Sequence, residues 1–188
     1  MPKKYVYSFR SDADGLEISV MKILPDTFPY RGILQLVHGM SEHKERYEAF
    51  MDYMAEKGFV TVIHDHRGHG GSVREKSDLG YMYGGGADAM LEDIAKVNRG
   101  IREEYPELPL ILMGHSMGSL AVRAFAAHHD DCMDMLIVCG SPSENKARVL
   151  GEMIAGLEKR ILGAKHKSSI LEVMSLGGYA WKFRKEKN

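Results

Sequence analysis

The chain has 188 residues, 44% of them hydrophobic, and its 25 Lys and Arg nearly balance its 26 Asp and Glu. This length and composition predict a single domain with a substantial core. The balanced charge excludes the basic field that nucleic acid or an anionic membrane attracts, and it favours a small ligand of little charge.

The sequence carries two cysteines and no apolar leader. Cys132 and Cys139 are the only cysteines, and the second lies in a predicted central strand, so a disulfide framework is not expected. The amino terminus lacks the apolar core of a signal peptide, and no apolar run is long enough to span a bilayer. These features predict a soluble, cytoplasmic protein without a transmembrane segment.

Six apolar or alternating runs predict β-strands. In chain order they are residues 5–10, 16–24, 32–37, 59–64, 110–113 and 135–140. The first two flank the turn-forming residues 12–15, which predicts an antiparallel hairpin with Ile18, Val20 and Ile23 buried. The later runs are almost continuously apolar, as expected of parallel strands that are covered on both faces.

Helical spacing of apolar residues appears between these strands. The predicted apolar faces are Tyr47, Phe50, Met51 and Met54 in the first helix, Met90, Leu91, Ile94, Val97 and Ile101 in the second, and Ala121 and Ala124 in the third. The alternation of strand and helix predicts right-handed parallel crossovers. A further amphipathic helix is predicted over residues 149–161, and no strand follows it.

The run Gly114-His115-Ser116-Met117-Gly118 joins the fifth predicted strand to the third helix. A serine on so tight a turn adopts a cramped backbone conformation, and both flanking positions are glycine. This Gly-x-Ser-x-Gly pattern is a nucleophile elbow, which aims the serine hydroxyl and the first N–H groups of the helix at one point. Ser116 is therefore the candidate nucleophile, with Gly114 and Gly118 as elbow glycines. A glycine-rich turn with an incidental serine is the alternative.

Three phrases of the sequence together resemble one known family. They are His38-Gly39-Met40-Ser41-Glu42-His43 with Arg46-Tyr47, Asp65-His66-Arg67-Gly68-His69-Gly70 with Ser72, and the elbow. The chain resembles the α/β-hydrolase group that contains monoacylglycerol lipases, lysophospholipases and other serine hydrolases. The resemblance implies an α/β sandwich with an eight-stranded, mostly parallel sheet and a helical cap after the sixth strand. Residues 1–142 would form the core with six strands and an amino-terminal hairpin, and residues 143–188 the beginning of the cap.

The resemblance also implies how an oxyanion would be held. It assigns the oxyanion donors to the backbone N–H groups of Met40, which follows His38 and Gly39, and Met117. The third and fifth strands are expected to be neighbours, which would bring both groups beside Ser116. An ordinary strand-ending turn is the alternative for His38 and Gly39, and His38 is interpreted as bracing the loop.

The acid and the histidine of the family's triad follow its seventh and eighth strands. Only six strands are predicted here, so both groups are expected beyond residue 188. His166 lies in a polar stretch and is not favoured, the side chain of His115 is expected to point away from the nucleophile, and His128 and His129 are expected at the surface. The 188 residues alone are therefore predicted to be inactive, and the apolar strand 135–140 is predicted to be an exposed edge that self-associates.

The alternating histidines His64, His66 and His69 raise the alternative of a zinc site. A metal-dependent hydrolase would need an acidic residue where Gly68 stands, so a metal is disfavoured. Asp65 and Arg67 are interpreted as groups that fix the loop. The sequence predicts neither a metal nor a cofactor.

The elbow predicts a serine hydrolase that works through an acyl-enzyme on Ser116, and the resemblance implies carboxylic ester substrates with an apolar acyl group, of the monoacylglycerol or lysophospholipid kind. A non-catalytic remnant that serves as a binding or assembly module is the competing class. A peptidase or an acyltransferase would use the same elbow. Periodicity leaves open whether the helix at 149–161 contacts substrate or only packs on the core.

Overall fold

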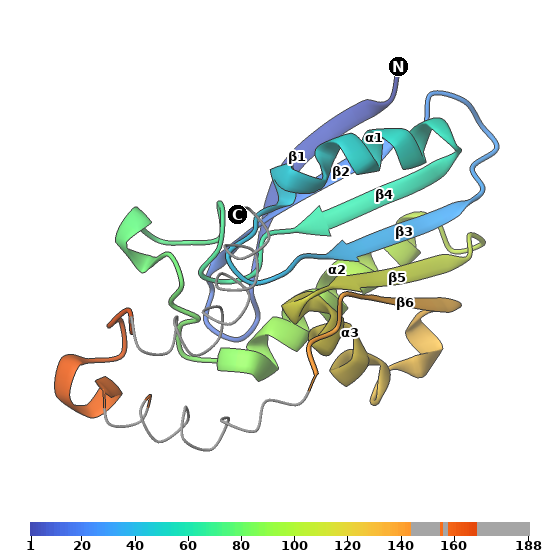
Figure 1. The fold of residues 1–188 in the computed structure, drawn as a ribbon. Coiled ribbons are helices and arrows are strands. Elements are labelled where there is room, and N and C mark those ends of the chain that lie inside the picture. The colour runs from blue at the N-terminus through green and yellow to red at the C-terminus, as the bar shows by residue number, and fades with distance from the viewer. Residues whose placement is uncertain (144–154, 156–157, 169–188) are drawn as a thin grey trace, which may run out of the picture. The chain divides into compact units, whose positions relative to one another are not determined.

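The computed structural model describes residues 1–143, 155 and 158–168, and the chain divides into two compact units, Met1–Pro142 and Ser143–Asn188. The strands of the first unit are β1 (Lys3–Arg10), β2 (Glu17–Leu24), β3 (Gly32–Val37), β4 (Phe59–His64), β5 (Leu110–His115) and β6 (Met135–Cys139) (Figure 1). Its helices are α1 (Glu48–Glu56), α2 (Gly86–Glu104) and α3 (Met117–Ala126), with short 3₁₀ turns η1 (Lys44–Tyr47), η2 (Lys76–Asp78) and η3 (Asp130–Cys132). In the second unit residues 155 and 158–162 are helical, and most of the helix predicted over 149–161 lies outside the described residues.

The six strands form one sheet in the order β1-β2-β4-β3-β5-β6. β1 and β2 form an antiparallel hairpin and β2 pairs antiparallel with β4, whereas β3 lies parallel to both β4 and β5, and β5 is parallel to β6. The predicted hairpin turn is closed by the Ser11 N–H, which donates to the Leu16 carbonyl, and Gly15 adopts a φ of 69° within it. The predicted α/β class and mostly parallel sheet are confirmed.

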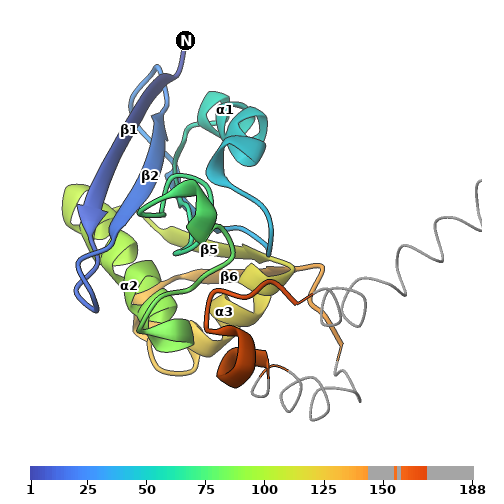
Figure 2. The ribbon, with the colours of Figure 1, turned by 90° about the vertical axis from the view of Figure 1, so that its left-hand side faces the viewer.

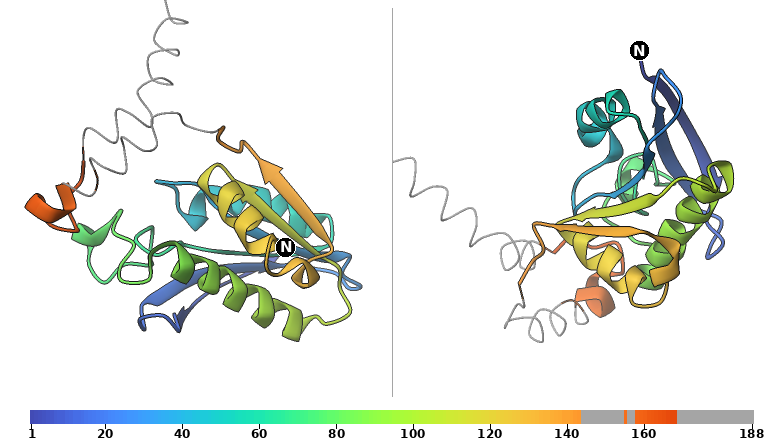
Figure 3. Two further views of the ribbon diagram at one scale, coloured as in Figure 1. Left: turned by 90° about the horizontal axis from the view of Figure 1, so that it is seen from below. Right: turned by 90° about the vertical axis from the view of Figure 1, so that its right-hand side faces the viewer.

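Helices cover both faces of this sheet. α1 lies on one face and α2 and α3 on the other, as the views from the side and from below show (Figures 2 and 3). Successive β3 residues serve the two faces in turn, because side chains alternate along a strand. Ile33 packs in the cluster with Ile94 and Phe125, and Leu34 packs in the cluster with Met51. A strand covered on both faces reads as an apolar run, which explains the sequence pattern.

One polar side chain lies inside β3. Gln35 is fully buried, although its strand was predicted from an apolar run. Its amide nitrogen donates to the Ile94 carbonyl at 3.1 Å, and its amide oxygen accepts from the Asn98 side chain at 2.8 Å. Because both ends of the amide have partners on α2, the polar group is tolerated in the core and fixes α2 against the strand.

Two details of the predicted packing were wrong. Ala124 is exposed, and α3 instead buries Val122 and Phe125 with Ala121. Phe50 is 39% exposed on α1, where Ala55 is buried beside Met51. These errors arise because the spacing of apolar residues indicates that a helix has an apolar face but does not fix how the helix is turned about its axis. Contact with the twisted sheet fixes which residues face inward.

β6 lies at the edge of the sheet that the described residues form, as predicted for residues 135–140, whereas the argument against a disulfide had placed Cys139 in a central strand. All five residues of β6 are exposed. Apolar content alone cannot distinguish an interior strand from an edge strand, since only the neighbouring strands decide which it is. None of the helices that the structure describes has the length and apolarity needed to cross a bilayer.

Candidate functional site

Ser116 occupies the junction of β5 and α3 in a strained backbone conformation. Its φ is 52° and its ψ is −118°, a backbone conformation that residues other than glycine rarely adopt. The flanking glycines are required by close backbone contacts. A Cβ on Gly114 would lie 2.3 Å from the Gly118 carbonyl oxygen, and a Cβ on Gly118 would lie 2.2 Å from the Val37 oxygen. The geometry is that of the predicted elbow.

The elbow is held by hydrogen bonds of its own backbone. The Ser116 N–H donates to the Cys139 carbonyl of β6 at 2.9 Å, and the Ser116 carbonyl accepts from both the N–H and the hydroxyl of Ser119. Ser116 thus caps α3, and the positive end of the helix dipole is directed toward it. Met117, a predicted oxyanion donor, is the first residue of this helix.

The loop after β3 lies against the nucleophile. β3 and β5 are parallel neighbours, as predicted, with Val37 opposite Gly114. A Cβ on Gly39 would lie 3.1 Å from the Cβ of Ser116, so a side chain there would force its neighbours to shift. Met40, the other predicted oxyanion donor, comes next in the chain. The residues 38–43, called the β3 loop below, therefore border the elbow.

A side-chain network that the sequence did not reveal joins the β3 loop to the elbow. The Glu42 carboxylate accepts hydrogen bonds from the Gly39 N–H at 2.8 Å and from the Tyr47 hydroxyl at 2.7 Å. His115 Nδ1 lies 3.2 Å from the same oxygen. His115, which was expected only to point away from the nucleophile, thus belongs to an organised polar cluster. In the sequence, the one indication of this cluster was that all of its residues lie in the segments that carry the family resemblance.

His38 and His66 are fully buried and hold backbone groups. His38 Nδ1 donates to the Gly39 carbonyl at 2.7 Å, and its Nε2 accepts from the His66 N–H at 3.0 Å. His66 Nε2 in turn donates to the His38 carbonyl at 3.1 Å. Burial lowers the pKa of His38 to about 4 and holds that of His66 well below its usual value. These neutral rings brace the loops, as the sequence indicated for His38, and the unpartnered Nδ1 of His66 is buried.

Residues 65–72, called the β4 loop below, bury charged groups in the same way. Asp65 pairs with the Lys44 ammonium at 2.7 Å and accepts from the Lys44 and Gly71 N–H groups. Arg67 is fully buried and forms ion pairs with Asp14 and Asp93, each at 3.1 Å. Both residues fix the loop, as expected. In the part of the chain that the structure describes, no three His, Cys, Asp or Glu side chains are arranged to hold a metal ion.

His64 and His69 lie beside the rings of His38 and His66, whereas other histidines are exposed. His128 and His129, which follow α3, are exposed as expected, and His166 is exposed in the second unit. Within residues 1–142, His115 is the imidazole that contacts the Glu42 carboxylate.

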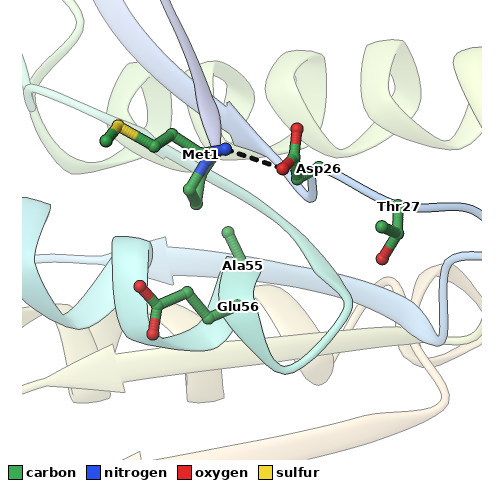
Figure 4. A pocket seen from close by; sticks show the side chains of 6 residues that line it. Met1, Asp26, Thr27, Ala55 and Glu56 are labelled. Carbon is green, nitrogen blue, oxygen red and sulfur yellow. Dashed lines mark hydrogen bonds and ion pairs between the residues drawn. The ribbon is translucent and has the colours of Figure 1, made fainter.

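A surface pocket lies away from the elbow. It is lined by Met1, Pro2, Asp26, Thr27, Ala55 and Glu56, and the Met1 amino group pairs with Asp26 at 2.7 Å (Figure 4). Asp26 and Thr27 precede β3, so the pocket borders the amino ends of the parallel strands, whereas Ser116 follows a carboxyl end. In α/β sheets ligands bind at the carboxyl ends of the strands, so this pocket lies at the opposite end from the expected site.

Known proteins share this sequence pattern. Residues 29–182 match the model of the family described as serine aminopeptidase, S33. The chain is 30% identical over 162 residues to a monoacylglycerol lipase of Mycolicibacterium smegmatis, which covers 80% of this chain and 55% of the relative. It is 28% identical over 167 residues to the human monoglyceride lipase, covering 88% of this chain and 51% of the relative. The chain thus spans about half the length of the curated relatives it matches.

Solved structures share the fold. A thermostable carboxyl esterase from Bacillus coagulans superposes with a TM-score of 0.74 at 31% identity, covering 85% of this chain and 50% of the esterase. A soluble variant of monoglyceride lipase from Saccharomyces cerevisiae superposes with a TM-score of 0.63 at 21% identity, covering 86% of this chain and 52% of that protein. The architecture is that of the α/β hydrolases.

Proposed function

Because the chain belongs to the serine aminopeptidase S33 family, we propose that it carries the nucleophile and the oxyanion site of a serine ester hydrolase. The observation that carries this proposal is the backbone of Ser116, held at φ 52° with Gly39 packed against its Cβ. Strain of this kind persists only where the surrounding structure enforces it, and such sites cluster where chemistry occurs. Relatives named as monoacylglycerol lipases support the reaction class.

In this mechanism the Ser116 oxygen attacks the ester carbonyl, and the backbone N–H groups of Met40 and Met117 stabilise the resulting oxyanion. The alcohol then leaves with the proton, and water hydrolyses the acyl-enzyme to regenerate Ser116. The reaction needs neither a metal nor a cofactor. The adjacency of the β3 loop to the elbow and the dipole of α3 support these roles.

We propose that the activating histidine and the acid come from the half of the relatives' length that this chain does not match. The hydrogen bonds of His38 support this proposal. Both of its ring nitrogens already have hydrogen-bond partners, so the ring cannot accept the serine proton. Without that base Ser116 keeps the weak nucleophilicity of an alcohol, and about a thousand-fold enhancement over water is expected from the oxyanion site and binding.

A fluorophosphonate probe tests Ser116 in the chain of 188 residues. The serine oxygen displaces fluoride from phosphorus, and its proton passes to a base in solution. Labelling should be slow, should rise with the concentration of added imidazole, and should disappear in Ser116→Ala. Ser8→Ala removes an exposed hydroxyl on β1, away from the elbow, and is the control, which should label like the unaltered chain. Equal labelling of the chain and Ser116→Ala would remove Ser116 from the mechanism.

We propose that the substrates are esters with medium to long apolar acyl chains, of the monoacylglycerol or lysophospholipid kind. The names of the relatives support this class. The family description favours one alternative, a peptidase. In a protein that contains this chain together with the later strands of the fold, hydrolysis should be faster for long-chain glyceryl esters than for acetyl esters. Faster cleavage of aminoacyl amides would favour the peptidase.

A non-catalytic assembly role is the second candidate, and the exposed β6 favours it. Met135, Leu136, Ile137 and Val138 are between 36% and 55% exposed. An apolar edge strand pairs readily with another chain, so we propose self-association through β6 or pairing with a partner that supplies strands. Ile137→Lys should reduce the mass measured by light scattering, whereas Val6→Lys on the opposite edge should not. A monomer at high concentration would contradict self-association.

We propose a cytoplasmic location for the protein. The two cysteines, Cys132 and Cys139, are free thiols in the structure, which fits a reducing compartment. Fractionation of cells that produce the tagged protein would test this, and recovery in the secreted fraction would contradict it.

A further inference from the structure

One oxygen of Glu42 collects hydrogen bonds from two elements. Its Oε2 accepts from the Gly39 N–H at 2.8 Å and from the Tyr47 hydroxyl at 2.7 Å, while Arg46 lies 3.2 Å from Oε1. The Glu42 side chain is only 9% exposed. A buried carboxylate with this many donors is held in one position, because moving it would leave several groups unpaired.

The same oxygen reaches the elbow through His115. Nδ1 of His115 lies 3.2 Å from Glu42 Oε2 and 3.1 Å from the Tyr47 oxygen. A carboxylate only accepts hydrogen bonds, so this nitrogen carries the proton. His115 is joined to Ser116 by a peptide bond, and Glu42 therefore connects the β3 loop to the residue that precedes the nucleophile.

The turn between Gly39 and Glu42 requires such a constraint. Ser41 adopts a φ of 59°, a left-handed conformation that costs a residue with a side chain and persists only when its surroundings enforce it. Gly39 is enclosed on both sides, since a Cβ there would lie 3.0 Å from Glu42 Oε2 and 3.1 Å from the Ser116 Cβ. The peptide that bears the Met40 N–H begins at this enclosed residue.

The charge of Glu42 is maintained by the same contacts. Burial alone would raise the pKa of this carboxyl, but donation from Tyr47, Gly39 and His115 outweighs burial and lowers the pKa below its usual value. Glu42 is thus ionised at neutral pH. An ionised acceptor binds an N–H more strongly than a neutral one, which favours a fixed turn.

We propose that Glu42 is a positioning residue, which holds the turn from Gly39 to Met40 against Ser116 so that the Met40 N–H faces the developing oxyanion. This role rests on the proposed serine hydrolase chemistry. Glu42 acts through the Gly39 N–H and through His115. Its loss should therefore slow the reaction of Ser116 and leave the binding of a probe almost unchanged, because small displacements of a reacting group reduce rate far more than affinity.

Two measurements on the 188-residue chain test the proposal, with imidazole added for the second. The first is amide hydrogen exchange at Gly39 by NMR, and the second is fluorophosphonate labelling of Ser116 resolved into kinact and KI. In Glu42→Ala, exchange at Gly39 should be at least about tenfold faster, since a charge-assisted bond is lost. Its kinact should fall by about a hundred-fold, with KI within about twofold.

Conservative and matched variants separate positioning from general destabilisation. Glu42→Gln keeps one oxygen for the Gly39 N–H and should recover most of kinact. Glu45→Gln changes an exposed carboxylate on the following turn, which pairs with His43 and Lys44, and should match the unaltered chain. Recovery of most of kinact and of most of the Gly39 protection by Glu42→Gln would support positioning, and a kinact in Glu42→Ala equal to that of Glu45→Gln would overturn it.

The two measurements also separate this proposal from the proposed function. Unchanged exchange at Gly39 in Glu42→Ala overturns the positioning role, whatever the labelling shows. Faster exchange together with no labelling of Ser116 in the unaltered chain overturns the hydrolase function and, with it, the catalytic consequence proposed for Glu42.

Discussion

The elbow around Ser116 and the β4 loop follow the carboxyl ends of β5 and β4, which β3 separates in the sheet, and polar groups have opposite environments in the two regions. The elbow holds a half-buried serine in a strained conformation. The β4 loop buries Asp65, His66 and Arg67 completely and gives them partners within the protein. Residue type therefore does not decide a role here. Burial and partners make one region structural and leave the other available for chemistry.

The largest expected effect concerns the buried charge of the β4 loop. Arg67→Ala removes the cation from Asp93, whose side chain is 2% exposed, and should lower the free energy of unfolding by about 3–5 kcal/mol. Arg102→Ala breaks a more exposed pair with Asp134 and should cost less than about 1 kcal/mol. Denaturant titration measures both variants. Similar losses of unfolding free energy in the two variants would contradict the distinction between the buried ion pairs of the β4 loop and those at the surface.

The next effect concerns the close packing of the elbow. Gly118→Ala would place a Cβ 2.2 Å from the Val37 oxygen and 2.5 Å from the His38 oxygen, so β3 or α3 must shift. Because these atoms belong to backbone, we expect a loss of about 3 kcal/mol by thermal or denaturant unfolding. Gly100→Ala on α2 meets nothing within 4 Å and should instead stabilise the chain by up to about 1 kcal/mol. A tolerated Gly118→Ala would contradict the elbow geometry.

A third effect is an acid sensitivity of the buried imidazoles. His64 is fully buried with neither ring nitrogen partnered among the described residues, and burial lowers its pKa from 6.5 to about 3. Above about pH 6.5 the ring is neutral in both states. Below about pH 6.5 the His64 ring binds a proton in the unfolded chain but stays neutral in the folded chain. The free energy of unfolding therefore falls as the pH falls toward 3.

Replacing His64 measures how much its imidazole contributes to the pH dependence of the free energy of unfolding. Between about pH 8 and pH 5 the His64 ring should account for a loss of about 2 kcal/mol, since one pKa unit corresponds to about 1.4 kcal/mol. His64→Leu should therefore lose less stability over this range than the unaltered chain, as followed by denaturant titration at each pH. His128→Leu, which removes an exposed imidazole, is the control. An unchanged pH dependence in His64→Leu would refute the prediction.

The smallest effect separates strain from chemistry at the nucleophile. Ser116→Gly removes the side chain from a φ of 52° and should raise the free energy of unfolding by up to about 1 kcal/mol. Ser116→Ala keeps the Cβ and the strain, so it should show no such gain. Both variants should lose fluorophosphonate labelling. Equal stability of the two variants would mean that the elbow stores no strain.

The sequence by itself determined the elements and their order. The apolar runs at residues 32–37 and 59–64 coincide with β3 and β4, because a strand covered on both faces must be apolar throughout. The elbow was equally readable, since Gly114 and Gly118 are the residues that a serine on so tight a turn requires. Local backbone sterics and burial are encoded in adjacent residues, so both features could be predicted without a structure.

Only the tertiary structure decided which side chains meet. Glu42 and His115 lie 73 residues apart, and the parallel pairing of β3 with β5 brings their loops together. His66 could have been a ligand or a brace until its burial and its hydrogen bonds with His38 identified it as a brace. The sequence pattern indicates which residues share a face of the same helix or strand. Contacts between elements depend on how the sheet aligns them, and that alignment follows from the packing of the whole core.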